Sequence, residues 1–319
     1  MAPSKLLKPQ ALKDGDRLAI IPLASTIQKN VLDSGLQFIK QLDFKAELIF
    51  DPVFRNYKSM FSAVSAKKRA EGLLGAFKNK NIDAVLSVRG GYGSAEMLPL
   101  IDFKAVARSA KIFCGFSDIT ALLVNLYQKS GLVCVHAPSL LTYGDKALKG
   151  SQDALKSLAV LNWFLRGEIK NPFEKTNLKI IKKGASSVKG RLTGGNLCIL
   201  ASLLGTEWEA NFDKHIVFLE ETGEAPYRVH RMLTQMRLAG KFDKVQALLL
   251  GDFIDTRKSV DKKEPTYEEV ILDVFKDKKF PILKGLPVGH GDLNYPMPIG
   301  LNAELKQNRL EFREQAVIL

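Results

Sequence analysis

The chain has 319 residues and a formal net charge of +13, with 47 Lys and Arg against 34 Asp and Glu. Hydrophobic residues make up 46% of the chain, enough for sizeable cores, and the length suits two domains better than one. No apolar run reaches the roughly 20 residues that a membrane helix needs. The N-terminal stretch MAPSKLLKPQALKDGDRL has no hydrophobic segment of the signal-peptide type. We therefore expect no membrane insertion and a cytoplasmic location.

Metal, nucleic-acid and disulfide chemistry are poorly supported by the sequence. Cys114, Cys134 and Cys198 are an odd number in apolar contexts, which predicts buried thiols in a reducing compartment. No CxxC or HExxH occurs, so we expect neither a metal nor another cofactor. Lysine runs such as SAKKRAEG, FKNKN and DVFKDKKF are typical of solvated helix faces and turns. Because no nucleic-acid motif accompanies them, we expect no nucleic-acid partner.

Strand-like and helix-like segments alternate through the first half of the chain. Strands are predicted at 17–24, 46–51, 82–90, 111–116 and 132–138, and helices at 30–42, 62–80, 94–101 and 119–129. This alternation predicts an α/β domain with a parallel sheet that is covered by helices on both sides. In such sheets, ligands bind beyond the C-terminal ends of the strands.

The second half has a different pattern, which begins after a less regular stretch at 142–190 with one amphipathic helix at 152–166. Further strands are predicted at 178–184, 186–195, 215–220 and 245–253, helices at 196–206, 226–240 and 266–278, and a hairpin at 303–314. This pattern predicts a second, mixed α/β domain with antiparallel edges. We place the first domain at 1–145, a linker at 146–185 and the second domain at 186–319.

Two polar residues, Ser117 and Asp118, interrupt the apolar segment KIFCGFSDITALLVNLY. They lie where the predicted strand ends and a helix begins. Either residue could cap the helix, because Ser and Asp side chains accept hydrogen bonds from the first-turn N–H groups. Alternatively, Ser117 is a nucleophile held on a sharp turn between strand and helix.

A serine nucleophile needs a base, and the chain offers four histidines. His290 lies between two glycines in the irregular stretch GLPVGHGDLNYPMPIG, where the backbone can present a side chain in a constrained loop. His136 closes a predicted strand at a plausible pocket position. His215 opens a strand at the opposite end, and His230 lies mid-helix between arginines. A hydrogen-bonded surface residue is the alternative interpretation of His290.

The base in turn needs an orienting carboxylate. Glu220 is the first charge after the apolar run 216–219 in HIVFLEETGEAPY, so it is either an ordinary strand terminator or a functional acid. Glu221 is interpreted as a loop residue. Glu224 precedes a predicted helix, where a carboxylate suits the positive end of the helix dipole.

A glycine-rich segment, LSVRGGYGSAEM, follows another strand and could supply N–H donors to an oxyanion. The N–H of Asp118, directly after the serine, would be the second donor. Phosphate binding is the alternative use of such a loop. However, the first strand is not followed by a dinucleotide fingerprint, and no GxxxxGK[ST] occurs.

Taken together, these segments resemble the LD-carboxypeptidases, a family of serine peptidases that includes muramoyl-tetrapeptide carboxypeptidases and microcin C self-immunity peptidases. The resemblance spans nearly the whole chain. It rests on the motifs RGGYG, GFSD, GGNL, LE-x-x-x-E-x-x-Y-x-x-x-R and GH…PIG, and on the blocks LKDGDRLAIIPLAS and VHAPSL.

The resemblance implies a fold and a set of site residues. The fold is a Rossmann-like N-terminal domain with a parallel sheet, followed by a β-rich C-terminal domain, in a homodimer. The matching positions give Ser117 as the nucleophile, Glu220 as the acid and His290 as the base. The backbone N–H groups of Gly91 and Asp118 match the oxyanion-hole positions.

The resemblance also implies an activity, which is hydrolysis of the bond between an L-configured centre and the terminal D-alanine of a murein tetrapeptide. Arg89, Gly90 and Tyr92 are the candidates for substrate binding, with Arg89 or a backbone nest for the terminal carboxylate. Two alternatives stay open. One is an immunity-type peptidase that cleaves a peptidyl-nucleotide amide, and the other is a non-catalytic binder of peptidoglycan fragments.

Overall fold

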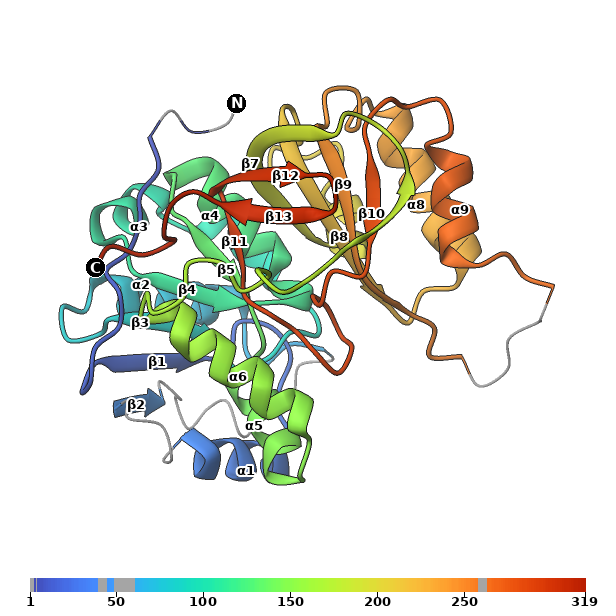
Figure 1. Cartoon of the computed structure of the whole chain (residues 1–319). Helices are drawn as coiled ribbons and strands as arrows, with labels where there is room; N and C mark the ends of the chain where they lie inside the picture. Colours follow the sequence, from blue (N-terminus) through green and yellow to red (C-terminus); the bar gives the residue numbers. More distant parts are fainter. Residues whose placement is uncertain (1–2, 4, 40–44, 49–60, 258–262) are drawn as a thin grey trace.

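Two β-sheets, built mainly from the two halves of the chain, lie side by side in the molecule (Figure 1). The structure is a computed structural model that describes residues 3, 5–39, 45–48, 61–257 and 263–319. The first sheet has six strands in the order β11-β5-β4-β3-β1-β2, and the second has seven in the order β13-β12-β7-β8-β9-β10-β6. The protein therefore has an α/β fold with one parallel-rich sheet and one larger mixed sheet.

The first sheet is parallel except at one edge. Its strands are β1 (Arg17–Ile21), β2 (Lys45–Leu48), β3 (Ala84–Ser87), β4 (Ile112–Gly115), β5 (Cys134–His136) and β11 (Met297–Ile299). Strands β1 to β5 pair in parallel, whereas β11 pairs with β5 in the antiparallel direction. Strand β3 and strand β4 are buried at every position, as expected for a sheet that is covered on both faces.

Helices cover both faces of this sheet (Figure 1). They are α1 (Lys29–Ile39), α2 (Ala66–Lys78), α3 (Phe103–Ser109), α4 (Thr120–Ser130), α5 (Leu140–Leu148) and α6 (Gln152–Leu165). Helix α5 packs on both α1 and α6, and α3 packs between α2 and α4. Since crossovers between parallel strands are right-handed, α1 lies on one face and α2 to α4 on the other.

The expected strands and helices of this half are largely confirmed, with shorter bounds. The segment predicted as a helix at 94–101 is a 3₁₀ helix, η2 (Ser94–Leu100). Helices α3 and α5 were not predicted from the sequence. The ends of two predicted elements, at 40–42 and 49–51, lie outside the described residues.

The second sheet combines a parallel centre with antiparallel edges, as predicted. Its strands are β6 (Lys179–Lys182), β7 (Ser187–Asn196), β8 (His215–Thr222), β9 (Ala247–Ile254), β10 (Ile282–Lys284), β12 (Asn302–Lys306) and β13 (Arg309–Phe312). Strands β7 to β10 run parallel. The predicted hairpin is β12 and β13, which pair in the antiparallel direction, whereas β10 and β11 were not predicted.

The helices of this half are α7 (Leu197–Ser202), α8 (Pro226–Leu238) and α9 (Tyr267–Val274). Helices α8 and α9 cover the outer face of the second sheet (Figure 1). Strand β8 faces two hydrophobic cores in turn. Ile216 and Phe218 belong to the core that is shared with the first sheet, and Val217 and Leu219 belong to the core beneath these helices. The period of two in a strand therefore directs Glu220 toward the first sheet.

Helix α4 joins the two halves. The hydroxyl Oγ1 of Thr120, at its start, accepts a hydrogen bond of 3.1 Å from the N–H of Asn196 at the end of β7. Near its end, the hydroxyl of Tyr127 lies 3.0 Å from Nε2 of His215. A Cβ on Gly195 would lie 2.6 Å from Oγ1 of Thr120, so the two backbones meet closely because a glycine is present there. These contacts fix the first turn of α4 against the second sheet.

The division into domains at 1–145 and 186–319 with a linker at 146–185 stays a prediction. Helix α6, inside the expected linker, packs on α5. Strand β6, also inside it, forms the edge of the second sheet beside β10. Strand β11 lies far along the chain and yet completes the first sheet next to β5.

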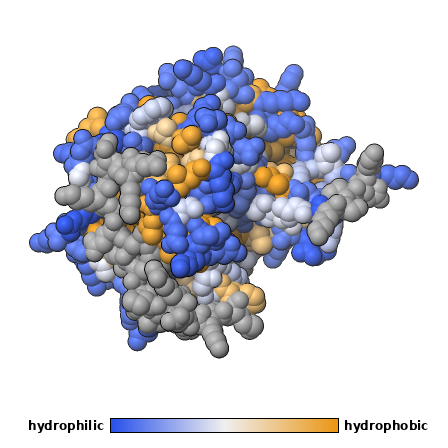
Figure 2. Space-filling view, turned by 90° about the horizontal axis from the view of Figure 1, so that it is seen from below, coloured by the Kyte–Doolittle hydropathy of each residue, from blue (hydrophilic) through white to orange (hydrophobic). Residues whose placement is uncertain are grey.

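The molecular surface is mostly hydrophilic, with small hydrophobic patches on the face drawn in Figure 2. Among the described residues, no helix combines the length and the apolar character that crossing a bilayer requires. The interpretation of the lysine-rich runs as solvated helix faces is wrong for one residue. Arg69, in SAKKRAEG, is fully buried instead of solvated, because the helix turns it inward while its neighbours Lys67 and Lys68 stay exposed.

We expect that Gly195→Ala destabilises the protein by about 1–3 kcal/mol, because the glycine has a φ of +134° and no room for a Cβ. The matched control is Gly75→Ala on the exposed side of α2, where a Cβ would meet nothing within 4 Å. The control should be stabilised by about 0.5–1 kcal/mol through helix propensity. Urea unfolding of both variants measures these changes. Equal effects of the two substitutions would contradict the close approach of α4 and β7.

Candidate active site

The turn that carries Ser117 is strained. Ser117 has a φ of +62°, in the left-handed region that side chains rarely adopt, and it opens a short 3₁₀ helix, η3 (Ser117–Ile119), directly after β4. No side chain caps η3 or α4. The carboxylate of Asp118 instead accepts the N–H of Ser94 at 2.8 Å. The capping interpretation is therefore wrong for both residues, and the hydroxyl of Ser117 remains for another partner.

That partner is His290. Its Nε2 atom lies 3.0 Å from Oγ of Ser117, and its Nδ1 atom lies 2.6 Å from Oε2 of Glu220. The ring is about one-fifth exposed, so it is not the surface histidine of the alternative interpretation, while Glu220 is fully buried. With its ring proton on Nδ1, His290 donates a hydrogen bond to the carboxylate of Glu220, and Nε2 can accept one from the hydroxyl of Ser117.

The loop around His290 is held by groups that the sequence did not single out. The carboxylate of Asp252 accepts the N–H of Gly291 at 2.9 Å. The side-chain oxygen of Asn294 accepts the N–H of Gly289 at 3.3 Å. Asp252 could have been found by the rule that pointed to Glu220, since it is the first charge after the apolar run of β9.

Glu220 and Glu221 point to opposite faces of β8 and have different partners. Glu220 faces His290. Glu221 is buried, and its carboxylate accepts the N–H of Cys198 at 2.7 Å and the amide of Asn196 at 3.1 Å. The interpretation of Glu221 as a loop residue is wrong, because β8 continues through Thr222. Burial raises the pKa of Glu221 to about 7 despite these donors.

The electrostatic environment favours the charged form of His290. Burial alone would lower its pKa, but the hydrogen bond and the charge of Glu220, with the charges of Glu221 and Asp252, raise the pKa above its ordinary value. His136 behaves in the opposite way. It is fully buried between the rings of Phe116 and Phe218, and burial lowers its pKa to about 4. His136 therefore lies neutral behind the site and makes no contact with the serine hydroxyl.

The other two histidines lie away from the site, as the sequence suggested. His215 starts β8 and is buried against Tyr127. His230, on α8, lies 3.5 Å from the carboxylate of Asp273 on the surface. Only His290 among the histidines contacts Ser117.

The glycine-rich segment lies directly against Ser117. A Cβ on Gly90 would lie 2.7 Å from Cβ of Ser117 and 3.1 Å from the backbone nitrogen of Asp118, so glycine is needed there. Within the described part of the chain, the N–H of Gly91 donates no hydrogen bond. Ser94 ties the two segments together, since its N–H and its hydroxyl both donate to Asp118. A substrate oxygen near Ser117 would thus meet backbone donors.

The remaining candidates for substrate binding lie at the edge of this segment. Arg89 is half-buried, and one guanidinium nitrogen donates to the carbonyl of Thr26 at 3.2 Å. Tyr92 is 53% exposed, and its ring lies beside that of Phe61, with centroids 5.3 Å apart. Neither side chain has a hydrogen bond to Ser117, whereas Gly90 contacts it directly.

The described residues contain no group of three or more His, Cys, Asp or Glu side chains arranged to hold a metal ion. The three cysteines are free thiols; Cys114 and Cys134 are buried, and Cys198 is partly exposed.

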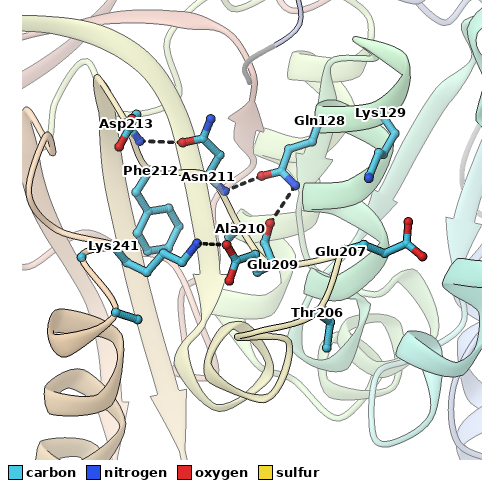
Figure 3. Close-up of a pocket in the computed structure, with 12 residues that line it drawn as sticks. Gln128, Lys129, Thr206, Glu207, Glu209, Ala210, Asn211, Phe212, Asp213 and Lys241 are labelled. Carbon is cyan, nitrogen blue, oxygen red and sulfur yellow. Dashed lines mark hydrogen bonds and ion pairs between the residues drawn. The ribbon is translucent and has the colours of Figure 1, made fainter.

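A polar pocket of about 510 Å³ lies at the other end of α4, roughly 16 Å along the helix from Ser117 (Figure 3). In Figure 3, Gln128 bridges to the loop of the second half: its amide donates to the carbonyl of Glu209 and its oxygen accepts from the N–H of Asn211. Lys241 pairs with Glu209 across the same space. The pocket contains no nucleophile and base in contact, so its polar groups serve the joint between the two halves.

The arrangement at Ser117 can carry out nucleophilic acyl transfer. It combines an alcohol, a base in hydrogen-bond contact with that alcohol, a buried carboxylate that orients the base, and backbone donors near the reaction centre. Such a set needs no further residue to form and to hydrolyse an ester intermediate.

Comparisons with known proteins agree with this chemistry. Residues 18–137 match the family model of the LD-carboxypeptidase N-terminal domain, and residues 189–305 match that of the LD-carboxypeptidase C-terminal domain. Together the two matches cover well over half of the chain.

Among the relatives, the murein tetrapeptide carboxypeptidase of Pseudomonas aeruginosa is 32% identical, over 93% of this chain and 95% of its own. The probable murein peptide carboxypeptidase of Bacillus subtilis is 31% identical, over 93% and 91%. Among solved structures, the microcin C7 self-immunity protein MccF in complex with glutamyl sulfamoyl guanosine has a TM-score of 0.84 at 22% identity, over 98% of this chain and 100% of that one. This last likeness shows the shared fold.

We expect that Glu220→Gln lowers the pKa of His290 by at least one unit, because it removes the negative charge that contacts Nδ1. Glu221→Gln should lower it far less, since Glu221 faces α7 and acts only through its charge. NMR titration of the imidazole resonances measures both shifts. In the pH dependence of activity, the Glu220→Gln enzyme should then keep its base neutral to a lower pH. A larger shift in the Glu221→Gln variant would mean that the orienting carboxylate was misidentified.

Proposed function

The chain belongs to the LD-carboxypeptidase family and is thus a hydrolase of the carboxypeptidase type, and from this we propose that it removes the terminal D-alanine from murein tetrapeptides. The bond cleaved joins an L-configured centre to D-alanine. The proposed catalytic residues are Ser117 as nucleophile, His290 as base and Glu220 as the acid that orients it. The substrate is a murein peptide or muropeptide.

One observation carries the proposal, which is the hydrogen-bonded chain from Ser117 through His290 to Glu220, with lengths of 3.0 and 2.6 Å. A protein that only binds peptidoglycan fragments does not require a base in line with a serine. The positive φ of Ser117 adds support, because backbone strain of this kind is stored at functional turns.

In the first half of the reaction, Oγ of Ser117 attacks the carbonyl carbon of the bond to D-alanine, and its proton passes to Nε2 of His290. The resulting imidazolium is stabilised by Glu220. The carbonyl oxygen becomes an oxyanion, which the N–H groups of Gly91 and Asp118 would hold. The C–N bond then breaks as His290 returns its proton to the leaving amine, so that D-alanine departs and an acyl ester remains on Ser117.

In the second half, His290 takes a proton from a water molecule, whose oxygen attacks the ester carbonyl. The C–O bond to Ser117 breaks, the serine recovers its proton from His290, and the shortened peptide leaves with a new carboxylate. All proton transfers use the same imidazole, and water is the co-substrate.

A carboxypeptidase must also recognise the free carboxylate of its substrate. Arg89 suits this role by its charge and by its position beside Gly90, and among the described residues only one of its nitrogens is engaged, with the carbonyl of Thr26. The N–H groups around Gly90 form a second candidate, and the exposed ring of Tyr92 could contact the rest of the peptide.

A second candidate function is the immunity-type activity, in which a peptidyl-nucleotide amide is cleaved. The specific observation in its favour is the close match in fold to MccF, which was solved with glutamyl sulfamoyl guanosine. The higher identity to relatives named for murein substrates favours the murein peptide as substrate. Both activities would use the same serine.

The setting that we propose is peptidoglycan recycling in the cytoplasm, by a homodimer without a nucleic-acid partner. The relatives named for murein peptides support the pathway. The homodimer is implied by the resemblance to the family. No step of the proposed reaction requires a cofactor.

We expect the purified protein to release D-alanine from a disaccharide-tetrapeptide, seen by mass spectrometry as loss of one alanine. It should act at least 100-fold less efficiently on a peptidyl sulfamoyl nucleotide. An enzyme for murein peptides needs no surface that binds a nucleobase, so the nucleotide part of this compound would add no favourable contact. The reverse preference would support the immunity-type activity. Binding of both compounds without turnover would leave the binder as the correct function.

We expect Ser117→Ala to lower kcat by about 10⁴-fold or more, by analogy with other triad knockouts, while the protein stays folded. Circular dichroism and thermal unfolding check the fold. Ser109→Ala provides the matched control, since this hydroxyl only returns to a carbonyl of its own helix α3. Near-normal D-alanine release by the Ser117→Ala protein would reject Ser117 as the nucleophile.

A further inference from the structure

Arg69 is the largest fully buried charged side chain in the described part of the chain, and the proposed chemistry makes no use of it. It lies on α2 with no exposed surface, although its helix neighbours Lys67 and Lys68 are exposed. Burying a guanidinium costs several kcal/mol unless its donors are satisfied. Such a residue therefore calls for a reason beyond filling space, which an apolar side chain would do at lower cost.

The guanidinium connects three segments that are separate in sequence. Nε donates to the carbonyl of Val64 at 3.0 Å, and Nη1 donates to the carbonyls of Leu23 at 3.0 Å and of Gly93 at 2.7 Å. Nη2 pairs with the carboxylate of Glu96 at 2.5 Å. Three of the four acceptors are backbone carbonyls, so Arg69 fixes the course of the main chain more than it neutralises charge.

One of these segments adjoins the proposed oxyanion hole. Gly93 comes two residues after Gly91, and a Cβ on Gly93 would lie 3.2 Å from both Nη atoms of Arg69, so the guanidinium lies directly against this glycine. The next residue, Ser94, donates through its N–H and its hydroxyl to Asp118. A continuous path thus runs from Arg69 through Gly93 and Ser94 to the residue after the nucleophile.

A second segment, around Leu23, supports the same loop. The chain turns after Leu23, whose carbonyl accepts from Arg69, and the hydroxyl of Ser25 then accepts the N–H of Tyr92 at 3.0 Å. The loop from Gly90 to Gly93 is therefore held at Tyr92 by Ser25 and at Gly93 by Arg69. Burial raises the pKa of Asp118, and the hydrogen bonds from Ser94 and the positive charge of Arg69 oppose this rise.

We propose that Arg69 is a positioning residue that sets the distance between the N–H groups of Gly91 and Asp118, and so the geometry of the oxyanion hole. This proposal rests on the proposed function for its catalytic readout. Arg69 touches no substrate; it acts through Gly93 and Ser94. Lysine cannot replace it, because a single ammonium cannot reach carbonyls on three sides as the planar fork does.

The decisive variant is Arg69→Lys, which keeps the charge and loses the fork. Because a displacement of about 1 Å in catalytic groups costs on the order of 100-fold in rate, kcat should fall by about 30- to 300-fold. The affinity for substrate should hold within threefold, measured as the Kd of the tetrapeptide in a Ser117→Ala background. Lys68→Met on the same helix and Glu96→Gln, which keeps all three carbonyl contacts, should change kcat by less than threefold.

Chemical rescue separates positioning from a general loss of packing. Guanidinium chloride at low millimolar concentration should raise the kcat of the Arg69→Ala variant at least tenfold. The same concentration of sodium chloride should leave this kcat unchanged. If Arg69→Lys retains kcat within threefold of the wild type, or if its substrate affinity falls in parallel with kcat, the proposal is wrong. Absence of rescue in a folded Arg69→Ala protein would also contradict it.

Hydrogen exchange gives a readout that does not depend on the substrate. In Arg69→Lys, the amides of residues 89–94 and 117–119 should exchange at least tenfold faster than in the wild type, while those of β8 stay unchanged. In Lys68→Met both regions should stay unchanged. If the wild type releases no D-alanine but this exchange pattern appears, the proposed function fails and the positioning by Arg69 stands. Unchanged exchange at both segments in Arg69→Lys would overturn the inference.

Discussion

The site depends on one contact between the two halves of the molecule, which is the first turn of α4 against the end of β7. Ser117 and Thr120 lie within one turn of each other. Thr120 accepts the N–H of Asn196, and Gly195 lets the backbones approach closely. Ser117, the proposed nucleophile, follows β4 of the first sheet, whereas Glu220 lies in β8 and His290 follows β10 of the second. Any sliding at this contact would separate them. The proposed catalysis therefore requires a rigid joint, which the shared hydrophobic core and the Tyr127–His215 pair support.

The choice between two adjacent glutamates is made by the pleat of one strand. Ile216, Phe218 and Glu220 share a face of β8 that looks toward the first sheet, while Glu221 turns toward the helices of the second half. Two adjacent carboxylates therefore have different partners. Glu220 contacts Nδ1 of His290 and favours the charged form of the imidazole, and Glu221 accepts the N–H of Cys198 at the start of α7. A shift of one residue in the register of β8 would exchange their positions.

The sequence predicted the parts of this structure that local chemistry specifies. The alternation of strands and helices indicated the parallel sheet, and Glu220 was found as the first charge after an apolar strand. The alternatives for Ser117 could not be resolved from the sequence, because a cap and a nucleophile have the same local pattern. The structure excludes the cap, since no side chain caps η3 or α4, and the nucleophile stays a proposal. Strand β11 and the inward turn of Arg69 were missed, since both depend on partners far along the chain that periodicity does not reveal.

The net charge of the chain and the charge around His290 have opposite signs. The whole chain carries a formal net charge of +13, which would attract an anionic molecule, such as the proposed murein peptide, from a distance. Around His290, however, Glu220, Glu221 and Asp252 make the local field negative and raise the pKa of the imidazole. A base with a raised pKa accepts a proton from serine more readily, but it must start in the neutral form, so activity declines as the pH falls through that pKa. The buried carboxylates therefore strengthen the base at the expense of its working range in acid. The backbone donors over Ser117 carry no such dependence, because amide groups do not titrate there.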